Sequence, residues 1–327
     1  MTRIAIIGAG LSGLVLAHRL QERASVTVFE KSRGVSGRMS TRYTERYQFD
    51  HGAQFFTAKT DNFQMFLQPL IAQGVVARWD AVFAELRRCE TISQRQWDKD
   101  FPHYVAVPGM NQLGKYLATD LTVHRRTRVA EIKATERGWY LLTATGDRLG
   151  EYDWVVSTVP PAQAAELLPA SFCHLPSLKK IKMLSCYALL LGMRSPIQLP
   201  WQAALVHDAD VSWISVNSSK PERSGGFCLL AHATNAWSEE HMEDEIDTIK
   251  HHLTRETSDL LGYDLTTADS CTVHRWRYAN IEKQTDPATY VDEERSLAAC
   301  GDWCIQGSVE AAYMSAVSLA DRFESLI

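Results

Sequence analysis

The chain has 327 residues, of which 45% are hydrophobic, so it can bury one large core or two ordinary ones. Its 34 basic and 39 acidic side chains give a formal net charge of −5 without a long basic run, which excludes nucleic acid as an expected partner. No apolar run reaches the roughly 18 residues of a membrane span, and the first strand begins too early to leave room for a signal peptide. With seven scattered cysteines and no C-x-x-C pair, we expect a globular, cytoplasmic protein with no membrane partner.

A glycine-rich loop follows an apolar strand at the start of the chain. Residues 4–13 read Ile-Ala-Ile-Ile-Gly-Ala-Gly-Leu-Ser-Gly, a G-x-G-x-x-G pattern formed by Gly8, Gly10 and Gly13 that also contains Ser12. Gly8 permits a tight strand-to-helix turn, and Gly10 lets a pyrophosphate approach the backbone. Gly13 lets the following helix, expected at 14–21, press against the strand, and the N-terminus of that helix attracts phosphate.

An acidic residue completes this dinucleotide-binding pattern. Glu30 follows the strand expected at 25–29 and lies 22 residues after Gly8, where a carboxylate can accept hydrogen bonds from both ribose hydroxyls of an adenosine. The alternative is a chance glycine turn. Strand, loop, helix and spaced glutamate together predict a βαβ unit that binds a dinucleotide.

The segment after Glu30 distinguishes FAD from NAD. It reads Lys31-Ser-Arg-Gly-Val-Ser-Gly37-Arg38-Met, a second glycine loop where classical dehydrogenases continue into a helix. This stretch resembles the second fingerprint of flavoprotein oxidases related to amine oxidase, which implies that Lys31 and Gly37 contact the cofactor and that Arg38 reaches back to the FAD pyrophosphate as a cationic fork. The alternative is that Arg38 is a solvated surface charge.

The next motif is Asp-His-Gly-Ala-Gln-Phe-Phe-Thr at residues 50–57. It is similar to the segment that runs under the isoalloxazine ring in the same flavoproteins, which implies that Gln54 and Phe55 contact the cofactor. His51 is expected near the cofactor, or else as a cap of its loop.

Two further segments fit the cofactor domain. Residues 121–132 read as two strands with a break, and the resemblance implies that the backbone of Val129 touches the adenine. Residues 154–159 read as a short buried parallel strand, ended by two prolines that cannot continue a ladder.

The last motif is Ala-Ala-Cys-Gly-Asp302-Trp, followed by Gly307-Ser-Val309 and a helical run to the C-terminus. In related flavoproteins the aspartate of this pair bonds the ribityl chain or phosphate, and the helix points its N-terminus at flavin N1 and C2=O. A helix dipole would stabilise the negative charge that reduced flavin carries there. Asp302 could instead be an ordinary turn residue.

Because these motifs occur at both ends and in the middle, the domains must be discontinuous. We expect an α/β fold with a Rossmann-type FAD/NAD(P)-binding domain, glutathione-reductase-like and amine-oxidase-like, formed by residues 1–60, 103–165 and 270–327. Residues 61–102 and 166–269 would form an α+β substrate domain. Within it we expect strands at 185–191, 211–216 and 226–232, and a helix at 239–261.

The full set of motifs resembles the renalase family, whose members share the amine oxidase fold. The resemblance rests on the segments 36–39, 50–57, 185–188, 230–233, 274–278 and 299–302. It implies an FAD-dependent oxidase that converts the 1,2- and 1,6-dihydro isomers of NAD(P)H to NAD(P)+ and reduces O2 to H2O2. The substrate would be a small-molecule dihydronicotinamide dinucleotide.

Two observations favour this activity over amine oxidation. Monoamine oxidases carry a tyrosine of their aromatic cage just after the glycine of the C-terminal helix motif, where this chain has Ser308. Many of them also bind FAD covalently through a cysteine upstream of the Gly-Asp pair, whereas residues 272–299 contain none, so we expect noncovalent FAD. An amine oxidase is the alternative function, and a non-catalytic escort or redox-sensor protein is a further one.

Hydride transfer requires geometry more than acid–base groups, so no catalytic side chain and no metal site are predicted. Tyr187 and His232 are candidates for orienting the carboxamide or ribose, and Trp276 and Tyr278 for stacking on the nicotinamide. The alternative for all four is core packing. Nothing in the sequence indicates an oligomeric state.

Overall fold

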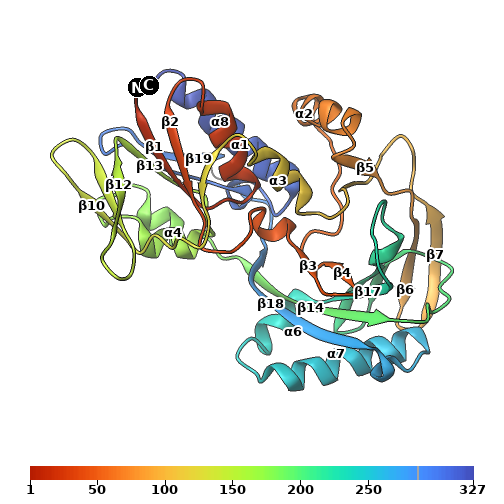
Figure 1. Cartoon of the computed structure of the whole chain (residues 1–327). Coiled ribbons are helices and arrows are strands. Elements are labelled where there is room, and N and C mark those ends of the chain that lie inside the picture. The colour runs from red at the N-terminus through yellow and green to blue at the C-terminus, as the bar shows by residue number, and fades with distance from the viewer. Residues whose placement is uncertain (286) are drawn as a thin grey trace. The chain divides into compact units, whose positions relative to one another are not determined.

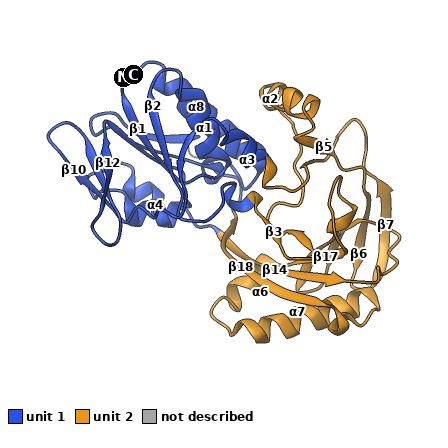
Figure 2. Cartoon of the chain, viewed as in Figure 1, with its two compact units in different colours: residues 1–38, 113–183, 281–327 blue, residues 39–112, 184–280 orange. Residues whose placement is uncertain are grey.

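The computed structural model describes residues 1–285 and 287–327 (Figure 1). The chain forms two compact units, each assembled from separate stretches of sequence (Figure 2). Unit 1 consists of Met1–Arg38, Leu113–Met183 and Ile281–Ile327, and unit 2 consists of Met39–Gln112 and Leu184–Asn280.

A six-stranded sheet with the order β19-β20-β13-β1-β2-β9 forms the centre of unit 1. All neighbours in it are parallel except the edge strand β19. Its strands are β1 (Arg3–Ile7), β2 (Ser25–Phe29), β9 (Thr122–His124), β13 (Trp154–Ser157), β19 (Thr289–Asp292) and β20 (Leu297–Cys300). Interior parallel strands are covered on both faces, which is why β1 is apolar almost throughout. The strand predicted at 25–29 is confirmed, and the one predicted at 154–159 is confirmed as a buried parallel strand that ends two residues earlier, at Ser157.

Helices and a small antiparallel sheet complete unit 1. Two helices pack on each other, α1 (Leu11–Leu20) and α8 (Val309–Phe323), with the Ser12 hydroxyl donating to the carbonyl of Ala312 at 2.8 Å. The other elements are α3 (Gln112–Leu117), α4 (Pro161–Leu167), α5 (Leu175–Leu178), η1 (Gly37–Met39), η4 (Asp302–Cys304), β10 (Glu131–Ala134), β11 (Trp139–Leu142) and β12 (Arg148–Tyr152). Buried residues such as Phe29, Trp139 and Trp303 form its core.

A seven-stranded sheet with the order β18-β14-β17-β16-β15-β6-β7 forms the centre of unit 2. Its neighbours are antiparallel except β15 and β6. The strands are β6 (Val82–Arg87), β7 (Glu90–Gln96), β14 (Leu184–Met193), β15 (Ala203–His207), β16 (Val211–Val216), β17 (Phe227–Ala233) and β18 (Ser270–Asn280). The predicted strands at 185–191, 211–216 and 226–232 are therefore confirmed within a residue or two at their ends.

The two faces of this sheet differ, because side chains alternate along a strand. On one face, Tyr187, Leu189 and Leu191 of β14 pack into a core with α7 (Ile246–Leu261). On the other face, Ala188 and Leu190 of β14 pack with the small hairpin of β3 (Thr41–Tyr43) and β4 (Gln48–Asp50). The remaining elements of unit 2 are α2 (Asp61–Ala72), β5 (Val76–Arg78), β8 (Tyr104–Ala106), η2 (Asn217–Ser219), α6 (Asn235–Glu240) and η3 (Leu265–Thr267).

Two expectations about boundaries differ from the structure. Residues 39–60, 103–112 and 270–280 lie in unit 2, and 166–183 lie in unit 1, because strand pairing decides membership: β18 pairs with β14, for example. The single helix predicted at 239–261 is wrong, since α6 and α7 are separate helices. Between them the imidazole of His241 bonds Asp244 at 2.7 Å and closes a turn.

Within the described residues, no helix combines the length and the apolar character that crossing a membrane requires.

Candidate functional site

The first glycine loop of unit 1 has a conformation that other residues would disrupt. Gly8 has φ +112°, a region that side chains disfavour. A Cβ on Gly13 would lie 2.0 Å from the carbonyl oxygen of Gly8. The helix can therefore approach the strand only with glycine at both positions.

Gly10 plays a different part, because a Cβ there would meet nothing within 4 Å among the described residues. It is the N-cap of α1, with φ −73° and no side-chain cap, and the first turn of the helix carries no acidic residue. The N-terminus of α1 therefore lies beside open space at Gly10 and carries no side-chain cap, an arrangement that suits a phosphate.

The second glycine loop lies directly on the first. The amide of Ser36 donates to the carbonyl of Ala9 at 2.8 Å. A Cβ on Gly37 would lie 3.3 Å from the Cα of Gly10, and Gly37 has φ +53°. The contacting residues of the two loops are 27 positions apart in sequence, and the loops thus form one surface beside the N-terminus of α1.

Arg38 and Asp302, two predicted cofactor residues, form an ion pair across 264 positions of sequence. Nη1 of Arg38 donates to Oδ2 of Asp302 at 2.8 Å, and Nη2 donates to Oδ1. Arg38 keeps 29% of its side chain exposed, whereas Asp302 keeps 7%. The alternative of Arg38 as a solvated charge does not hold, because the side chain is partly buried and bidentate.

Glu30 ends β2 and binds the loops around it. Its Oε2 accepts from the amide of Ala9 at 2.9 Å, and its Oε1 accepts from the amide of Ser32 at 2.7 Å. Its carbonyl accepts from the amide of Thr127 at 2.9 Å, which places the segment leading to Val129 beside it. The Val129 side chain is buried in the core of unit 1, so only its backbone remains for the predicted adenine contact.

The last three predicted residues of this unit differ in setting. Val309 is the first residue of α8, as predicted, and the helix is capped by Ser308, whose hydroxyl accepts from the amide of Ala311 at 3.1 Å. Ser12 is buried and joins α1 to α8. Lys31 is exposed and reaches Gln163 at 3.3 Å.

These residues fit a flavin dinucleotide. The open space at Gly10 suits a pyrophosphate, and the carboxylate of Glu30 suits a ribose. Burial raises the pKa of Cys300 to about 12 and that of Cys304 well above its ordinary value, so both thiols near Asp302 are protonated at neutral pH.

Unit 2 contains a buried ionic network around Asp50, whose side chain is fully buried. Its Oδ2 accepts from Nη2 of Arg223 at 2.7 Å and from Nζ of Lys220 at 3.4 Å, and its Oδ1 accepts from the hydroxyl of Thr41 at 2.7 Å and the amide of Met110 at 3.0 Å. Burial alone would raise the pKa of Asp50, but the two cations outweigh it and hold the pKa below its ordinary value.

Lys220 is also fully buried, and burial lowers its pKa to about 8. Its Nζ donates to Oδ1 of Asn217 at 2.9 Å and to Oε1 of Gln54 at 3.1 Å. Within the described part of the chain, Asp50 is the one carboxylate that contacts Lys220 or Arg223. The network therefore holds two cations and one anion.

The amide of Gln54 is fully engaged with protein groups. Oε1 accepts from Lys220 and, at 2.9 Å, from the hydroxyl of Ser215, while Nε2 donates to the carbonyl of Asp50 at 2.5 Å and to that of Gly52 at 2.9 Å. Gln54 thus fixes the 50–54 turn rather than offering a free amide to a ligand.

Three histidines gather at this turn. His51 is buried, with ring centroids 4.4 Å from His274. Nε2 of His232 lies 3.4 Å from the carbonyl of His51. Burial, helped by His274 and Arg42, lowers the pKa of His51 to about 3. Burial also lowers the pKa values of His232 and His274 to about 4, so all three rings are neutral near pH 7.

The structure separates the predicted substrate residues by the faces of the sheet. His232 and His274 both pair with Ala188, on the face opposite α7. Trp276 lies on that face too: its ring stacks on His51, and its Nε1 donates to the carbonyl of His51 at 2.8 Å. Tyr278 is half-buried and lies where the pairing of β18 with β14 shifts register.

Tyr187 lies on the other face, fully buried in the core, and its hydroxyl donates to the carbonyl of His241 at 2.9 Å. This position favours the alternative of core packing for Tyr187.

Phe55 belongs to an aromatic cluster on the same side of unit 2 as His51. Its ring centroid lies 4.8 Å from that of His103, 4.9 Å from that of Trp97 and 5.5 Å from that of Trp213. Phe55 is half-buried, as are His103 and Trp213. The cluster presents ring surface next to the 50–54 turn.

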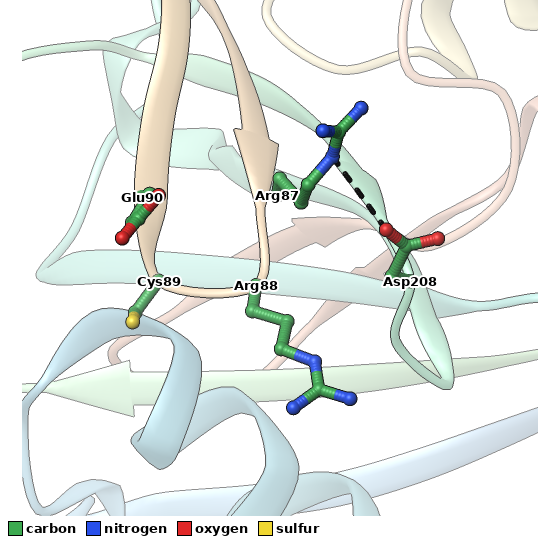
Figure 3. Close-up of a pocket in the computed structure, with 5 residues that line it drawn as sticks. All are labelled: Arg87, Arg88, Cys89, Glu90 and Asp208. Carbon is green, nitrogen blue, oxygen red and sulfur yellow. Dashed lines mark ion pairs between the residues drawn. The ribbon is translucent and has the colours of Figure 1, made fainter.

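A surface pocket lies away from these residues, at the β6–β7 turn (Figure 3). It is lined by Arg87, Arg88, Cys89, Glu90 and Asp208. Arg87 and Asp208 pair at 3.6 Å and keep 64% and 67% of their side chains exposed, so the pocket has no buried polar group that would hold a ligand. No group of metal-ligating side chains occurs among the residues that the structure describes.

Sequence reasoning missed Arg42, His274, Lys220 and Arg223 as site residues. Arg42 and His274 each stand within or beside a quoted motif, so their positions gave a signal that was not used. Lys220 and Arg223 belong to no motif, and charged residues in a loop ordinarily indicate a solvated surface.

Comparison with known proteins agrees with this arrangement. The family model "Flavin containing amine oxidoreductase" matches residues 63–323, and the model "NAD(P)-binding Rossmann-like domain" matches residues 6–70. Renalase of Mus musculus is 25% identical over 308 residues, which cover 86% of each chain.

Solved structures share the fold at low sequence identity. Cyclohexylamine oxidase from Brevibacterium oxydans is 13% identical with a TM-score of 0.72, and the match covers 99% of each chain. Putrescine oxidase bound to putrescine is 14% identical with a TM-score of 0.71, again over 99% of each chain. UDP-galactopyranose mutase is 13% identical with a TM-score of 0.73, over 100% of this chain and 94% of the other. Because a mutase and two oxidases share it, the fold alone does not set the reaction.

The family match covers most of the chain and brings with it a flavin cofactor and oxidoreductase chemistry. The predicted fold class and the resemblance to renalase are both confirmed. The chain belongs to the flavin containing amine oxidoreductase family, and within it the chain is renalase-like.

Proposed function

We propose that this protein is an oxidase with noncovalently bound FAD that converts the 1,2- and 1,6-dihydro isomers of NAD(P)H to NAD(P)+. Bound FAD would supply a hydride acceptor at N5 and a route for the two electrons to O2, with H2O2 as the second product. Loss of hydride makes the dihydropyridine ring of the substrate aromatic, so the protein has to position the ring rather than abstract a proton.

The residues of unit 1 would hold the cofactor. The amides at the start of α1, together with Arg38, would bind the pyrophosphate, and Glu30 would bind the adenosine ribose. Asp302 would bind the ribityl chain while it keeps Arg38 in place. The dipole of α8 would stabilise negative charge on the reduced ring.

The residues of unit 2 would form the substrate slot. Trp276 and Tyr278 would stack against the nicotinamide, and Phe55 would extend the aromatic wall. His232 is neutral and its Nε2 faces the carbonyl of His51, so its Nδ1 can accept a hydrogen bond from the carboxamide without placing a charge beside the ring.

One observation carries the choice of substrate over an amine. Among the residues that the structure describes, the buried side chains around the 50–54 turn include the cations Lys220 and Arg223 but only one carboxylate, Asp50. The neighbouring histidines are neutral and do not offset this charge. An alkylamine is a cation near pH 7 and would be repelled by such a site, whereas a dinucleotide is an anion.

The test begins with the purified protein, which should be yellow. Acid precipitation should release all of the flavin into the supernatant, and flavin left in the pellet would overturn the noncovalent part of the proposal. Anaerobic stopped-flow mixing should then show rapid bleaching of the flavin by the dihydronicotinamide isomers, with slow bleaching by ordinary NADH. Rapid bleaching by benzylamine or putrescine, with none by the isomers, would assign the protein to amine oxidation. A colourless protein that takes up no FAD would favour the non-catalytic alternative.

A further inference from the structure

We propose that Arg42, held by His274, is a phosphate subsite that recognises the diphosphate of the dinucleotide substrate. The inference rests on the proposed function and names the group that selects a dinucleotide over the bare nicotinamide riboside.

The main contact of Arg42 is a histidine ring. It lies on β3, is half-buried, and its Nη2 donates to Nδ1 of His274 at 3.3 Å. In the part of the chain that the structure describes, no carboxylate pairs with Arg42. Arginines drawn out of solvent are normally paired with an anion, so this guanidinium has unused charge and unused donors.

The groups near Arg42 do not balance its positive charge. His51, His274 and His232 are neutral and offer none. Asp50 is the nearby carboxylate, and its oxygens are occupied by Lys220, Arg223, Thr41 and the amide of Met110. The charge on Arg42 is therefore left for a group from outside the chain.

A phosphate group suits the donor geometry of Arg42. A guanidinium presents parallel N–H donors whose spacing matches two oxygens of a phosphate. The Nδ1 atom of His274 accepts from Arg42, which holds the guanidinium in one orientation and leaves its other N–H groups for a ligand. The proposed substrate carries two phosphates between its nucleosides, so the diphosphate is the matching partner.

The experiment compares two reductants that share one ring. Wild type and Arg42→Gln are mixed anaerobically with a dihydronicotinamide dinucleotide and with the corresponding dihydronicotinamide riboside, which has no phosphate. We expect the concentration for half-maximal flavin reduction to rise tenfold or more for the dinucleotide and to change less than twofold for the riboside. Arg42→Lys should recover part of the loss. The matched control is Arg87→Gln, an exposed arginine of unit 2.

A second readout does not involve turnover. Titration of the oxidised enzyme with NAD+, followed by calorimetry, should show the same weakening in Arg42→Gln. In the wild type, raising the ionic strength should weaken binding of the dinucleotide but not of the riboside, a result that stands even if the variant fails to fold.

The outcomes separate the two proposals. Equal losses for both reductants, unchanged binding of the dinucleotide, or equal salt dependence for both would overturn the phosphate subsite. Failure of both reductants to bleach the wild-type flavin would instead overturn the proposed function, and NAD+ binding would still test Arg42.

Discussion

The glycine loops of unit 1 and the ionic turn of unit 2 are held by opposite kinds of force. The backbone packing at Gly8 and Gly13 requires residues without a side chain. A Cβ on Gly13, for example, would enter the space of a backbone carbonyl. Around Asp50 the structure depends on charges that are present and fully withdrawn from water. Substitutions that add volume should destabilise the first region, and its stability should not depend on pH. The second region should tolerate substitutions that change shape but should be destabilised by those that change charge.

The largest effect is expected from Asp50→Asn, which keeps the shape and removes the charge. Lys220 and Arg223 would then be two buried cations without an anion, and breaking a buried pair in this way costs about 3–5 kcal/mol. Urea denaturation followed by tryptophan fluorescence measures the free energy of unfolding. Asp208→Asn, at an exposed carboxylate, is the control and should change little. Equal midpoints for the two variants would contradict the view that charge holds this turn.

Lys220→Met tests whether charge balance, rather than the size of the side chain removed, determines the stability of the network. It leaves Asp50 with Arg223, a balanced pair, so it should cost less than Asp50→Asn although it removes a longer side chain.

The second effect is steric and tests the other region. Gly13→Ala would force a Cβ to within 2.0 Å of a carbonyl, and overpacking of this kind costs about 1–3 kcal/mol or more. Gly10→Ala should fold normally but bind less flavin, because its Cβ would enter open space where the pyrophosphate is expected. Gly34→Ala, also open, is the matched control. Flavin content per protein and the melting temperature separate the three, and full flavin in Gly10→Ala would argue against a pyrophosphate at that position.

The third effect is a pH dependence of stability that comes from three histidines of unit 2. The folded-state pKa values of His51, His232 and His274 lie at about 3, 4 and 4, below the ordinary 6.5. Between pH 6.5 and 4 the unfolded chain binds protons that the folded chain does not, so the free energy of unfolding falls as the pH falls. Each histidine contributes about 1.4 kcal/mol per pH unit, and nothing above pH 6.5.

The pH slope has its own control. His51→Gln should reduce the slope in urea titrations between pH 6.5 and 4, whereas His251→Gln, at an exposed position on α7, should leave it unchanged. A slope that is the same in both variants would mean that His51 takes up its proton in the folded protein.

The smallest effect is expected from Trp276→Phe. The ring can still stack on His51, but the donor to the carbonyl of His51 is lost, and a hydrogen bond of this kind contributes about 1 kcal/mol. If Trp276 serves chiefly to stack on the substrate, Trp276→Phe should keep the substrate affinity that Trp276→Ala loses. A loss of affinity as large in Trp276→Phe would assign the role to the indole N–H.

The dinucleotide-binding fold of unit 1 could be predicted from the sequence because the motifs that specify it are contiguous in the chain. Gly8 to Gly13 and the strand ending at Glu30 are contiguous, and steric rules dictate what each glycine does. The ion pair between Arg38 and Asp302 could not be predicted from the sequence. The two residues are 264 positions apart, and each was assigned to the cofactor separately.

Unit 2 could be read only in part. The alternation of β14 and β17 predicted strands, yet it does not say which face a helix covers, so Tyr187 and His232 were grouped although they lie on opposite faces. The ionic network of Asp50 with Lys220 joins residues 170 positions apart, and no sequence motif or residue spacing predicts this contact.

The hydrogen bonds of the Gln54 amide limit which residues can replace it during evolution. Its oxygen faces two donors and its nitrogen faces two carbonyls, so the side chain has a direction. A glutamate, one nucleotide change or one deamidation away and almost identical in shape, would bring an oxygen against the carbonyls of Asp50 and Gly52. Glutamate, the residue most similar to glutamine in shape, should therefore be excluded at position 54. Homologues that keep this turn should keep glutamine there.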